Sequence, residues 1–251
     1  MHKGVIVTGG AHGIGKQICE TFLKNGYYVS FIDIDQKLGN LFAQKYDHLF
    51  FYHGDVKDKN QLKEFILFSK EKLQRIDVVV NNACYGKGGI LNDASYEDFD
   101  EVLSVGLKAP YELSRLCKEE LELNNGRIIN IASSRAFQSE PNTECYASAK
   151  GGIVALTHAL AISLGPKVLV NCIAPGWIDV NHTPYFSKED THAIPAGKVG
   201  NPQDIADAVL FLVNQDFITG ETITIDGGMN KRMIYHGDWN WKYSVDSDDN
   251  K

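Results

Sequence analysis

Short apolar runs alternate along this chain with longer segments of helical pattern, and this alternation limits the possible folds more than any other feature. Runs such as Val5–Val7 and Val78–Val80 are apolar at every position, which is typical of strands covered on both faces of a parallel sheet. Strands that alternate with helices form βαβ units. The sequence therefore predicts an α/β protein whose single domain, residues 1–230, holds a doubly wound parallel sheet with helices on both faces.

The pattern also gives approximate bounds for the elements. The expected strands are Val5–Thr8, Tyr28–Ile32, Leu49–Tyr52, Val78–Val80, Arg127–Ile131, Val168–Ile173 and Thr222–Ile225. The expected helices are Gly13–Asn25, Gln36–Tyr46, Lys59–Leu73, Tyr96–Leu121, Thr143–Leu164 and Pro202–Val213. The fourth helix contains Pro110, and a proline inside a helix removes a hydrogen bond, so we expect a kink or a break there.

Composition excludes several classes of function. The formal net charge of −7 gives no basic surface for nucleic acid or for an anionic membrane, and no run of about 18 apolar residues predicts a membrane span. The five cysteines are scattered without a CxxC pair, and the histidines show no metal-ligand spacing, so we expect neither a disulfide framework nor a metal. A reducing cytoplasm is the expected location.

A glycine-rich turn joins the first strand to the first helix. Its sequence is Thr8-Gly9-Gly10-Ala11-His12-Gly13-Ile14-Gly15, a T-G-x-x-x-G-x-G spacing. Glycines allow close approach of a ligand, and the free N–H groups of a helix N-terminus attract a pyrophosphate. In this strand–turn–helix context the motif predicts a dinucleotide site of the Rossmann type, although the same glycines would also suit a simple tight turn.

Asp33 ends the second strand, eighteen residues beyond Gly15. A carboxylate at this place accepts hydrogen bonds from both ribose hydroxyls of adenosine and repels a 2′-phosphate. No arginine lies nearby in the sequence to receive such a phosphate. The pattern favours NAD over NADP, and the alternative role for Asp33 is a helix N-cap.

Tyr146 and Lys150 are four residues apart and therefore share one face if the segment is helical. A neighbouring ammonium group favours the ionised form of a phenol, so the pair suits general acid–base chemistry on a hydroxyl or a carbonyl. Taken alone, the pair would equally fit an ordinary surface contact between residues i and i+4.

Taken together, the motifs resemble those of the short-chain dehydrogenase/reductase family over about residues 3–230. The matching segments are the Thr8–Gly15 turn, Asp55-Val56, Asn81-Asn82-Ala83, Asn130-Ile131-Ala132-Ser133, Tyr146 with Lys150, Asn171 to Pro175-Gly176, and Asp226-Gly227-Gly228. The resemblance implies an NAD-dependent oxidoreductase that transfers a hydride between the cofactor and a secondary alcohol or ketone. It also implies a homotetramer, or at least a homodimer, built through the long helices.

The resemblance assigns roles to individual residues. Ser133 would hydrogen-bond the substrate oxygen, with Ser134 as its rival; Tyr146 would donate and accept the proton; and Lys150 would support Tyr146 and hold the nicotinamide ribose. The implied cofactor-binding set is Thr8, Gly9, Gly13, Ile14, Gly15, Asp33, Asp55, Val56, Asn82, Ala83, Tyr146, Lys150, Pro175, Gly176 and Ile178.

Three positions depart from the family pattern. Gly106 stands where the family usually has an asparagine whose water chain serves the lysine, and we expect a water or a polar side chain to fill that space. Val180 replaces a common threonine, for which Thr183 is a candidate substitute, and Cys84 replaces a glycine and is interpreted as a small buried residue. Gly106 supports the alternative hypothesis, a catalytically weak NAD(H)-binding sensor or scaffold protein.

Charged and aromatic residues also gather outside these motifs. The acidic run that includes Asp98 and Glu101 predicts a solvated helix face. Arg135 and Glu140, between Ser133 and Tyr146, are interpreted as surface charges, with a place at the pocket as the alternative. The polar stretch from Asn181 to Gly200 favours a polar substrate. The tail, residues 231–251, holds Trp239 and Trp241, and we expect it to pack at a subunit contact or over a pocket, with a patch of its own subunit as the alternative.

Overall fold

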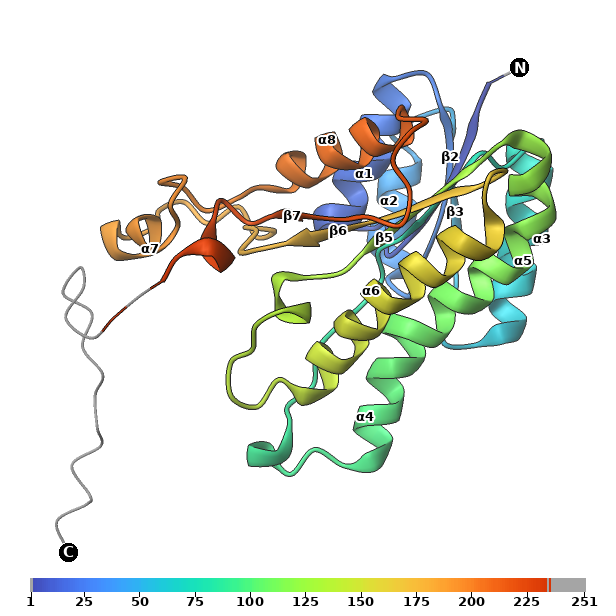
Figure 1. Ribbon diagram of the computed structural model, residues 1–251. Helices are drawn as coiled ribbons and strands as arrows, with labels where there is room; N and C mark the ends of the chain where they lie inside the picture. The colour runs from blue at the N-terminus through green and yellow to red at the C-terminus, as the bar shows by residue number, and fades with distance from the viewer. Residues whose placement is uncertain (1, 234, 236–251) are drawn as a thin grey trace, which may run out of the picture.

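Seven parallel strands form the sheet of the computed structural model, which describes residues 2–233 and 235 (Figure 1). The strands are β1 (Gly4–Thr8), β2 (Tyr28–Asp33), β3 (Leu49–His53), β4 (Val78–Asn81), β5 (Arg127–Ile131), β6 (Leu169–Pro175) and β7 (Thr222–Ile225). They lie in the order β3-β2-β1-β4-β5-β6-β7. This order confirms the doubly wound sheet. The order of connection changes sides between β1 and β4, and sheets of this kind bind ligands at that point, beyond the carboxyl ends of the strands.

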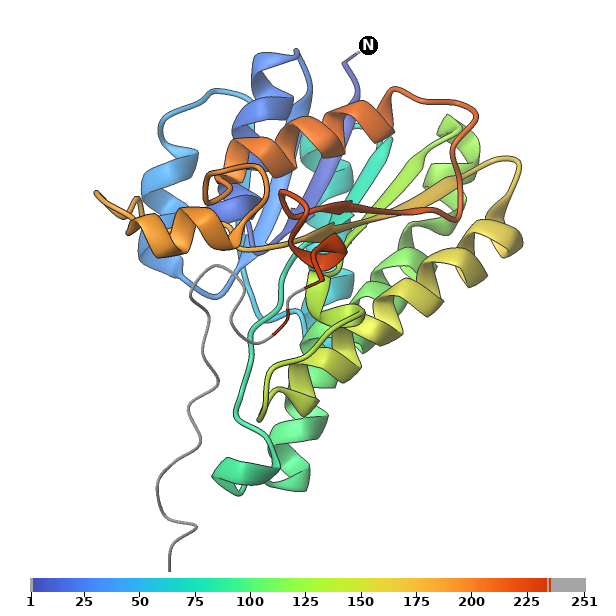
Figure 2. The ribbon, with the colours of Figure 1, turned by 60° about the vertical axis from the view of Figure 1, so that its left-hand side comes forward.

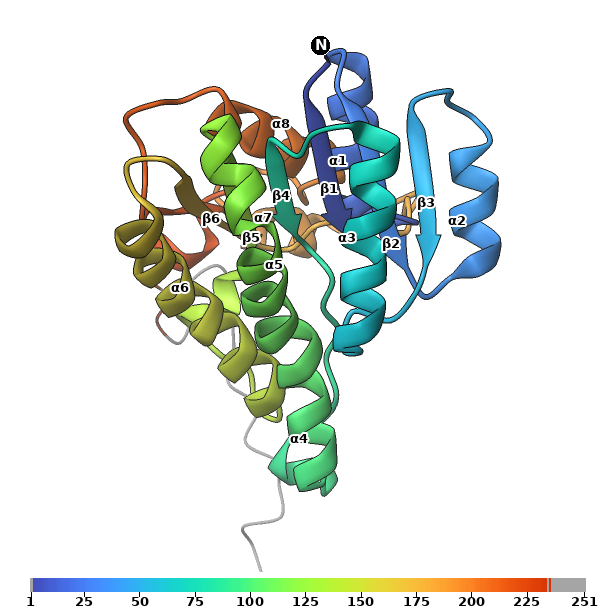
Figure 3. The same cartoon turned by 90° about the vertical axis from the view of Figure 1, so that its right-hand side faces the viewer.

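Helices cover both faces of the sheet, as the sequence predicts (Figure 1, Figure 3). The helices are α1 (Gly13–Lys24), α2 (Gln36–Ala43), α3 (Lys59–Leu73), α4 (Tyr96–Leu103), α5 (Ala109–Asn124), α6 (Glu144–Leu164), α7 (Lys188–Ala193) and α8 (Pro202–Val213). One core cluster joins Phe22 of α1 and Val209 of α8 to Phe31 of the sheet. The cluster on the opposite face joins Phe65 of α3 and Leu113 of α5 to the sheet. Burial of these side chains therefore fixes two helical layers on one sheet.

The predicted interruption near Pro110 is confirmed. A π-helical turn, Ser104–Lys108, separates α4 from α5 and places Pro110 in the first turn of α5, where its missing N–H costs no helical hydrogen bond. Figure 3 shows α4 continuing the line of α5 beyond the sheet. The interruption thus lies just before the proline and carries Gly106.

A buried row of polar side chains fixes α6 on the sheet. The Nδ2 of Asn81 donates to the Oδ1 of Asn130 on the neighbouring strand at 2.8 Å, and the Nδ2 of Asn130 donates to the Oγ1 of Thr157 on α6 at 2.9 Å. Buried amides need such partners, so this row sets the position of the helix along the strands. The chain leaves β4 and β5 toward the side where α4 extends (Figure 2), and α6 presents Tyr146 and Lys150 at that end.

Candidate active site

The glycine-rich turn between β1 and α1 is shaped by positions that only glycine tolerates. Gly9 and Gly13 have φ angles of +69° and +55°, and a Cβ on Gly15 would lie 2.0 Å from the carbonyl oxygen of Gly9. The Oγ1 of Thr8 accepts hydrogen bonds at 3.0 Å from the backbone N–H groups of Asn82 and Ala83. Thr8 therefore fixes the turn against the β4 loop and is not part of the cavity wall.

The N-terminus of α1 points into this turn without a side-chain cap. His12 is the N-cap residue, and its side chain accepts no hydrogen bond from the first N–H groups of the helix. Such N–H groups and the positive end of the helix dipole bind anions. The geometry therefore fits a pyrophosphate at the place that the sequence motif predicted.

A cavity of about 520 Å³ runs from this turn along the carboxyl ends of the strands. Of the predicted cofactor residues, Thr8 and Ile178 lie outside its wall. The predicted residues that line it are Gly9, Gly13, Ile14, Gly15, Asp33, Asp55, Val56, Asn82, Ala83, Ser133, Tyr146, Lys150, Pro175 and Gly176. The fold thus brings together residues from loops that are far apart in the sequence.

Asp33 occupies the adenosine end of the cavity and is 7% exposed. Its Oδ2 accepts from the N–H of Ala11, and its Oδ1 accepts from the N–H of Asp35, both at 2.9 Å. Asp35, not Asp33, caps α2 by accepting from the N–H of Leu38. The alternative interpretation of Asp33 as an N-cap is therefore wrong.

Ser133, Tyr146 and Lys150 meet at the other end of the cavity. Lys150 is 3% exposed, and its Nζ donates to the carbonyl oxygen of Ile131 at 2.7 Å and lies 5.5 Å from the centre of the Tyr146 ring. The Oγ of Ser133 accepts from the N–H of Arg135 at 3.2 Å. Ser134, the rival serine, is absent from this wall and lines only the adjoining cavity.

That second cavity, of about 780 Å³, adjoins the first at Ser133, Tyr146 and Gly176. Arg135 and Glu140 belong to its wall and form an ion pair with each other. Both side chains remain partly exposed, at 38% and 68%, so they are surface charges that also border this cavity. Ile178 lines this cavity rather than the first.

The position that the family fills with asparagine is closed in this protein. A Cβ on Gly106 would lie 2.9 Å from the Sγ of Cys84 and 3.0 Å from the Cβ of Ala149. A thiol and a methyl group therefore border this position, and the expectation of a water or a polar side chain near Lys150 stays a prediction. Cys84 is also only partly buried and lines the first cavity. Thr183 does not substitute at Val180, since its hydroxyl bonds Asp179 outside the cavity wall.

Packing at Gly106 leads to a stability prediction. We expect Gly106→Asn to lower the free energy of unfolding by about 1–3 kcal/mol, because the new side chain overpacks a filled space. Adding Cys84→Gly should recover part of that loss. The coupling free energy between the two substitutions, measured by urea unfolding of the double-mutant cycle, should be ~0.5 kcal/mol or more. Gly151→Asn on α6 is the matched control, since nothing lies within 4 Å of a Cβ there. Equal losses at both glycines would contradict the prediction.

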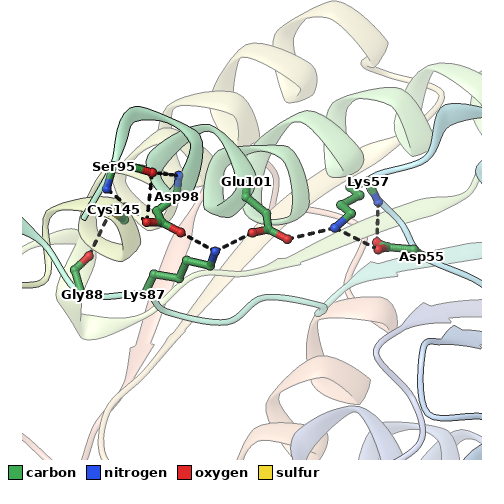
Figure 4. Close-up of polar contacts among 8 residues, drawn as sticks. All are labelled: Asp55, Lys57, Lys87, Gly88, Ser95, Asp98, Glu101 and Cys145. Atoms are coloured by element: carbon green, nitrogen blue, oxygen red, sulfur yellow. Dashed lines mark hydrogen bonds and ion pairs between the residues drawn. The ribbon is translucent and has the colours of Figure 1, made fainter. Parts of the chain in front are cut away.

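A chain of ion pairs spans the outer side of the first cavity (Figure 4). The Nζ of Lys57 lies 3.4 Å from the Oδ2 of Asp55 and 2.9 Å from the Oε1 of Glu101. Lys87, in the loop after β4, pairs with Asp98 and with Glu101 of α4. Contact with Lys87 lowers the pKa of Glu101 to about 2 and that of Asp98 to about 2.

This network adds ion pairs to the acidic run, whose helix face remains partly exposed to solvent. Asp98 and Glu101 tie α4 to two loops that border the cavity. The pKa of Glu101 is lowered from 4.5 to about 2. The stabilisation that its ion pairs give is therefore fully present above about pH 4.5 and is lost as the pH falls toward 2. The sequence shows Lys57 and Lys87, but only the tertiary structure determines which carboxylates they pair with.

We expect Glu101→Gln to weaken cofactor binding about two- to fivefold, because the network positions the loops and exposed ion pairs have small effects. The effect should shrink in concentrated salt, which screens exposed charges. Calorimetric titration of the cofactor at low and high salt measures it. Glu97→Gln is the control, since Glu97 on the same helix forms none of the ion pairs found within residues 2–233. A salt-independent loss would contradict this role.

Comparison with known proteins decides the family. A family model described as enoyl-(acyl carrier protein) reductase matches residues 9–230. The chain belongs to the short-chain dehydrogenase/reductase family. An uncharacterized oxidoreductase of Thermotoga maritima is 40% identical over 93% of this chain and 98% of its own. A 3-oxoacyl-acyl-carrier-protein reductase of Chlamydia muridarum is 34% identical over 91% and 98%, and an L-fucose dehydrogenase of Mus musculus is 33% identical over 90% and 88%.

Solved structures of this family give the same fold. An apo SCOR enzyme from Clostridium thermocellum has a TM-score of 0.95 and 69% identity, over 98% of this chain and 100% of its own. A 3-ketoacyl-(acyl-carrier-protein) reductase from Brucella melitensis, solved with NADH, has a TM-score of 0.84 and 28% identity over 91% and 98%. A blue fluorescent protein from a metagenomic library, solved with NADPH, has a TM-score of 0.83 and 26% identity over 90% and 97%. These similarities support a nicotinamide-dependent oxidoreductase that acts on alcohol or keto groups.

Proposed function

We propose that the protein is an NAD-dependent dehydrogenase or reductase that interconverts a secondary alcohol and its ketone. One observation carries the proposal: a single cavity connects the turn at the N-terminus of α1 with Ser133, Tyr146 and Lys150. The adjoining cavity reaches the same serine and tyrosine from the other side. A dinucleotide and a substrate therefore have separate spaces that meet at the reacting groups.

The residues present fit a nicotinamide dinucleotide. Gly9, Gly13 and Gly15 form a tightly packed turn on the cavity wall, α1 offers uncapped N–H groups, and Asp33 stands at the far end of the cavity. When bound, the cofactor supplies the hydride acceptor of the oxidation or the hydride donor of the reduction. The protein supplies binding, orientation and the proton.

Proton transfer in the proposed mechanism belongs to Tyr146. In the oxidation, the hydroxyl proton of the alcohol would pass to the phenol oxygen of Tyr146, and a carbonyl group would remain once a bound cofactor had accepted the hydride. The ammonium group of Lys150 lies 5.5 Å from the centre of the Tyr146 ring, on the same cavity wall. The hydroxyl of Ser133 hydrogen-bonds the substrate oxygen, and the reverse reaction returns the proton from Tyr146.

The preference for NAD over NADP is part of this proposal. The Asp33 carboxylate, held by the N–H groups of Ala11 and Asp35, offers its remaining lone pairs to ribose hydroxyls and repels a 2′-phosphate. We expect NAD(H) to bind at least about tenfold more tightly than NADP(H), since one such repulsion amounts to about 1.4 kcal/mol when partly screened. Calorimetric titration of both cofactors measures the ratio.

Asp33→Asn is the diagnostic variant for cofactor choice. The asparagine amide keeps an acceptor for one backbone N–H but carries no charge. The ratio of the affinity for NAD(H) to that for NADP(H) should therefore fall toward one. Asp47→Asn, at an exposed carboxylate after α2, serves as the control. Equal affinities in the unmodified protein would overturn the assignment to NAD.

We also propose a homotetramer, or at least a homodimer. Tyr96, Tyr111 and Ile162, on α4, α5 and α6, are 80%, 54% and 84% exposed, which favours a partner surface over these helices. By length and composition α6 is also apolar enough to cross a membrane, and 33% of its most apolar stretch is buried. Because the same helix carries Tyr146 and Lys150 at the cavity, we assign its apolar surface to a subunit contact. Light scattering in solution tests this, and a monomeric mass would contradict it.

The remaining expectations on partners and location follow from the sequence. A small-molecule substrate, no nucleic acid and no membrane suit the net charge of −7. The free state of all five cysteines suits a reducing cytoplasm. The expected packing of the aromatic tail around Trp239 and Trp241 lies outside the described residues.

A further inference from the structure

The second cavity, beside Ser133 and Tyr146, is walled by polar and apolar groups in about equal measure. Hydroxyl and amide side chains come from the loop after β5 and the start of α6: Ser134, Gln138, Ser139 and Thr143. Three larger apolar side chains also line it: Trp177, Ile178 and Met229. A long acyl chain would leave the polar half of this wall without hydrogen-bond partners, which disfavours it.

The cations of this wall are already neutralised. Arg135 pairs with Glu140, and Lys87 pairs with Asp98 and Glu101 of α4. A substrate carboxylate would have to displace one of these side chains in a protein whose net charge is −7. The cavity therefore does not favour an anionic substrate.

The Arg135–Glu140 pair suits neighbouring hydroxyl groups instead. A guanidinium group only donates hydrogen bonds and a carboxylate only accepts them, whereas each hydroxyl does both. The backbone N–H of Arg135 also bonds the Oγ of Ser133 at 3.2 Å, so the backbone from which this side chain extends is held next to Ser133, on the wall of the same cavity. Hydroxyls beside the reacting carbon would therefore bridge the two charged side chains.

Trp177 adds a flat face to the same cavity. Its indole is 41% exposed and is held edge-to-face against Phe186, with ring centres 5.6 Å apart and planes at 88°. The negative face of an aromatic ring attracts C–H groups that carry partial positive charge, as those next to hydroxyls do. A sugar or cyclic polyol presents such a C–H face and hydroxyl edges at once.

Building on the proposed function, we infer that the substrate is a neutral polyhydroxylated molecule, a sugar or a polyol, selected by Arg135 and Glu140. The reacting hydroxyl lies at Ser133 and Tyr146, and its neighbours bond the ion pair. Arg135 and Glu140 are specificity residues, since the proton and hydride transfers do not pass through them.

The test compares ring alcohols that differ only in their substituents. The unmodified enzyme and NAD⁺ are assayed with inositols, cyclohexanol and a hydroxycyclohexanecarboxylate, beside aldoses, alditols and long-chain secondary alcohols. We expect the best polyol or sugar to exceed cyclohexanol about 100-fold or more in kcat/KM, because a site built to bond hydroxyls rejects analogues that lack them. A hydroxy acid or a long-chain alcohol as the best substrate would overturn the inference.

Two variants assign the selection to the ion pair. Arg135→Gln and Glu140→Gln should each lower the polyol-to-cyclohexanol ratio of kcat/KM at least about tenfold, mainly through the KM of the polyol. Glu112→Gln is the matched control, since it breaks the Arg115–Glu112 pair on α5, away from both cavities, and should leave the ratio unchanged. An unchanged ratio in both cavity variants would refute the role of the pair.

A binding measurement separates this inference from the proposed function. Polyols are titrated calorimetrically into the enzyme–NAD⁺ complex, with folding of each variant checked by its affinity for NAD⁺. If no alcohol is oxidised but polyols bind and Arg135→Gln weakens them, the proposed reaction fails while the recognition stands. If alcohols are oxidised but no sugar or polyol binds or reacts, the inference fails while the dehydrogenase stands.

Discussion

Replacing Tyr146 with phenylalanine is expected to lower kcat by about 10²–10⁴-fold, because the change deletes the proton that passes to and from the substrate oxygen. The ring itself stays, and it lines both cavities and faces Gly86 and Lys150. The dissociation constant for NAD should therefore change by no more than about twofold. Steady-state rates and calorimetric titration of the same preparation measure the two quantities.

Tyr111→Phe provides the comparison for this experiment. Tyr111 lies on α5, is 54% exposed and is absent from the walls of both cavities, so its replacement should leave the rate unchanged. Retention of most activity by Tyr146→Phe with any good substrate would show that another group moves the proton.

Lys150→Ala is expected to impair both binding and turnover. The ammonium group is almost fully buried and lies between the carbonyl oxygen of Ile131 and the Tyr146 ring, on the wall of the cofactor cavity. Removing a preorganised charge of this kind should lower kcat about 10²–10³-fold. Loss of its hydrogen bonds should raise the dissociation constant of NAD about tenfold or more.

The variant also leaves the carbonyl oxygen of Ile131 without its lysine partner, so its thermal unfolding is measured beside the kinetics. Lys167→Ala, at an exposed lysine after α6, is the control and should resemble the unmodified enzyme. A variant that loses stability but keeps its rate and its affinity for NAD would reduce Lys150 to a structural role.

Much of the fold was predictable because its determinants are local. Uninterrupted apolar runs such as Val78–Val80 predicted buried parallel strands, and Pro110 predicted the break that the π-helical turn supplies. The four-residue spacing of Tyr146 and Lys150 predicted that both share one helix face, and both lie on α6. Element ends shifted by a few residues, as for β6, which ends at Pro175 rather than at Ile173.

The unpredicted parts of the site depend on contacts between distant segments. The sequence leaves open whether Arg135 and Glu140 face the pocket, because their place on the second cavity depends on the path of the loop after β5. The filling of the Gly106 position needs Cys84, from the loop after β4, and Ala149, from α6. The short helix α7 lies within a stretch that was interpreted only as polar.

Hydride transfer itself tests the central claim most directly. The purified protein is mixed with NAD⁺ and, in turn, with a panel of secondary alcohols, sugars and polyols, and with NADH and the matching ketones, while the absorbance of the reduced cofactor is recorded. We predict that at least one alcohol reduces NAD⁺ in stoichiometric amounts and that Tyr146→Phe abolishes the signal without abolishing NAD binding. Tight binding of NAD with no transfer in either direction would contradict the account and favour a sensor or scaffold protein.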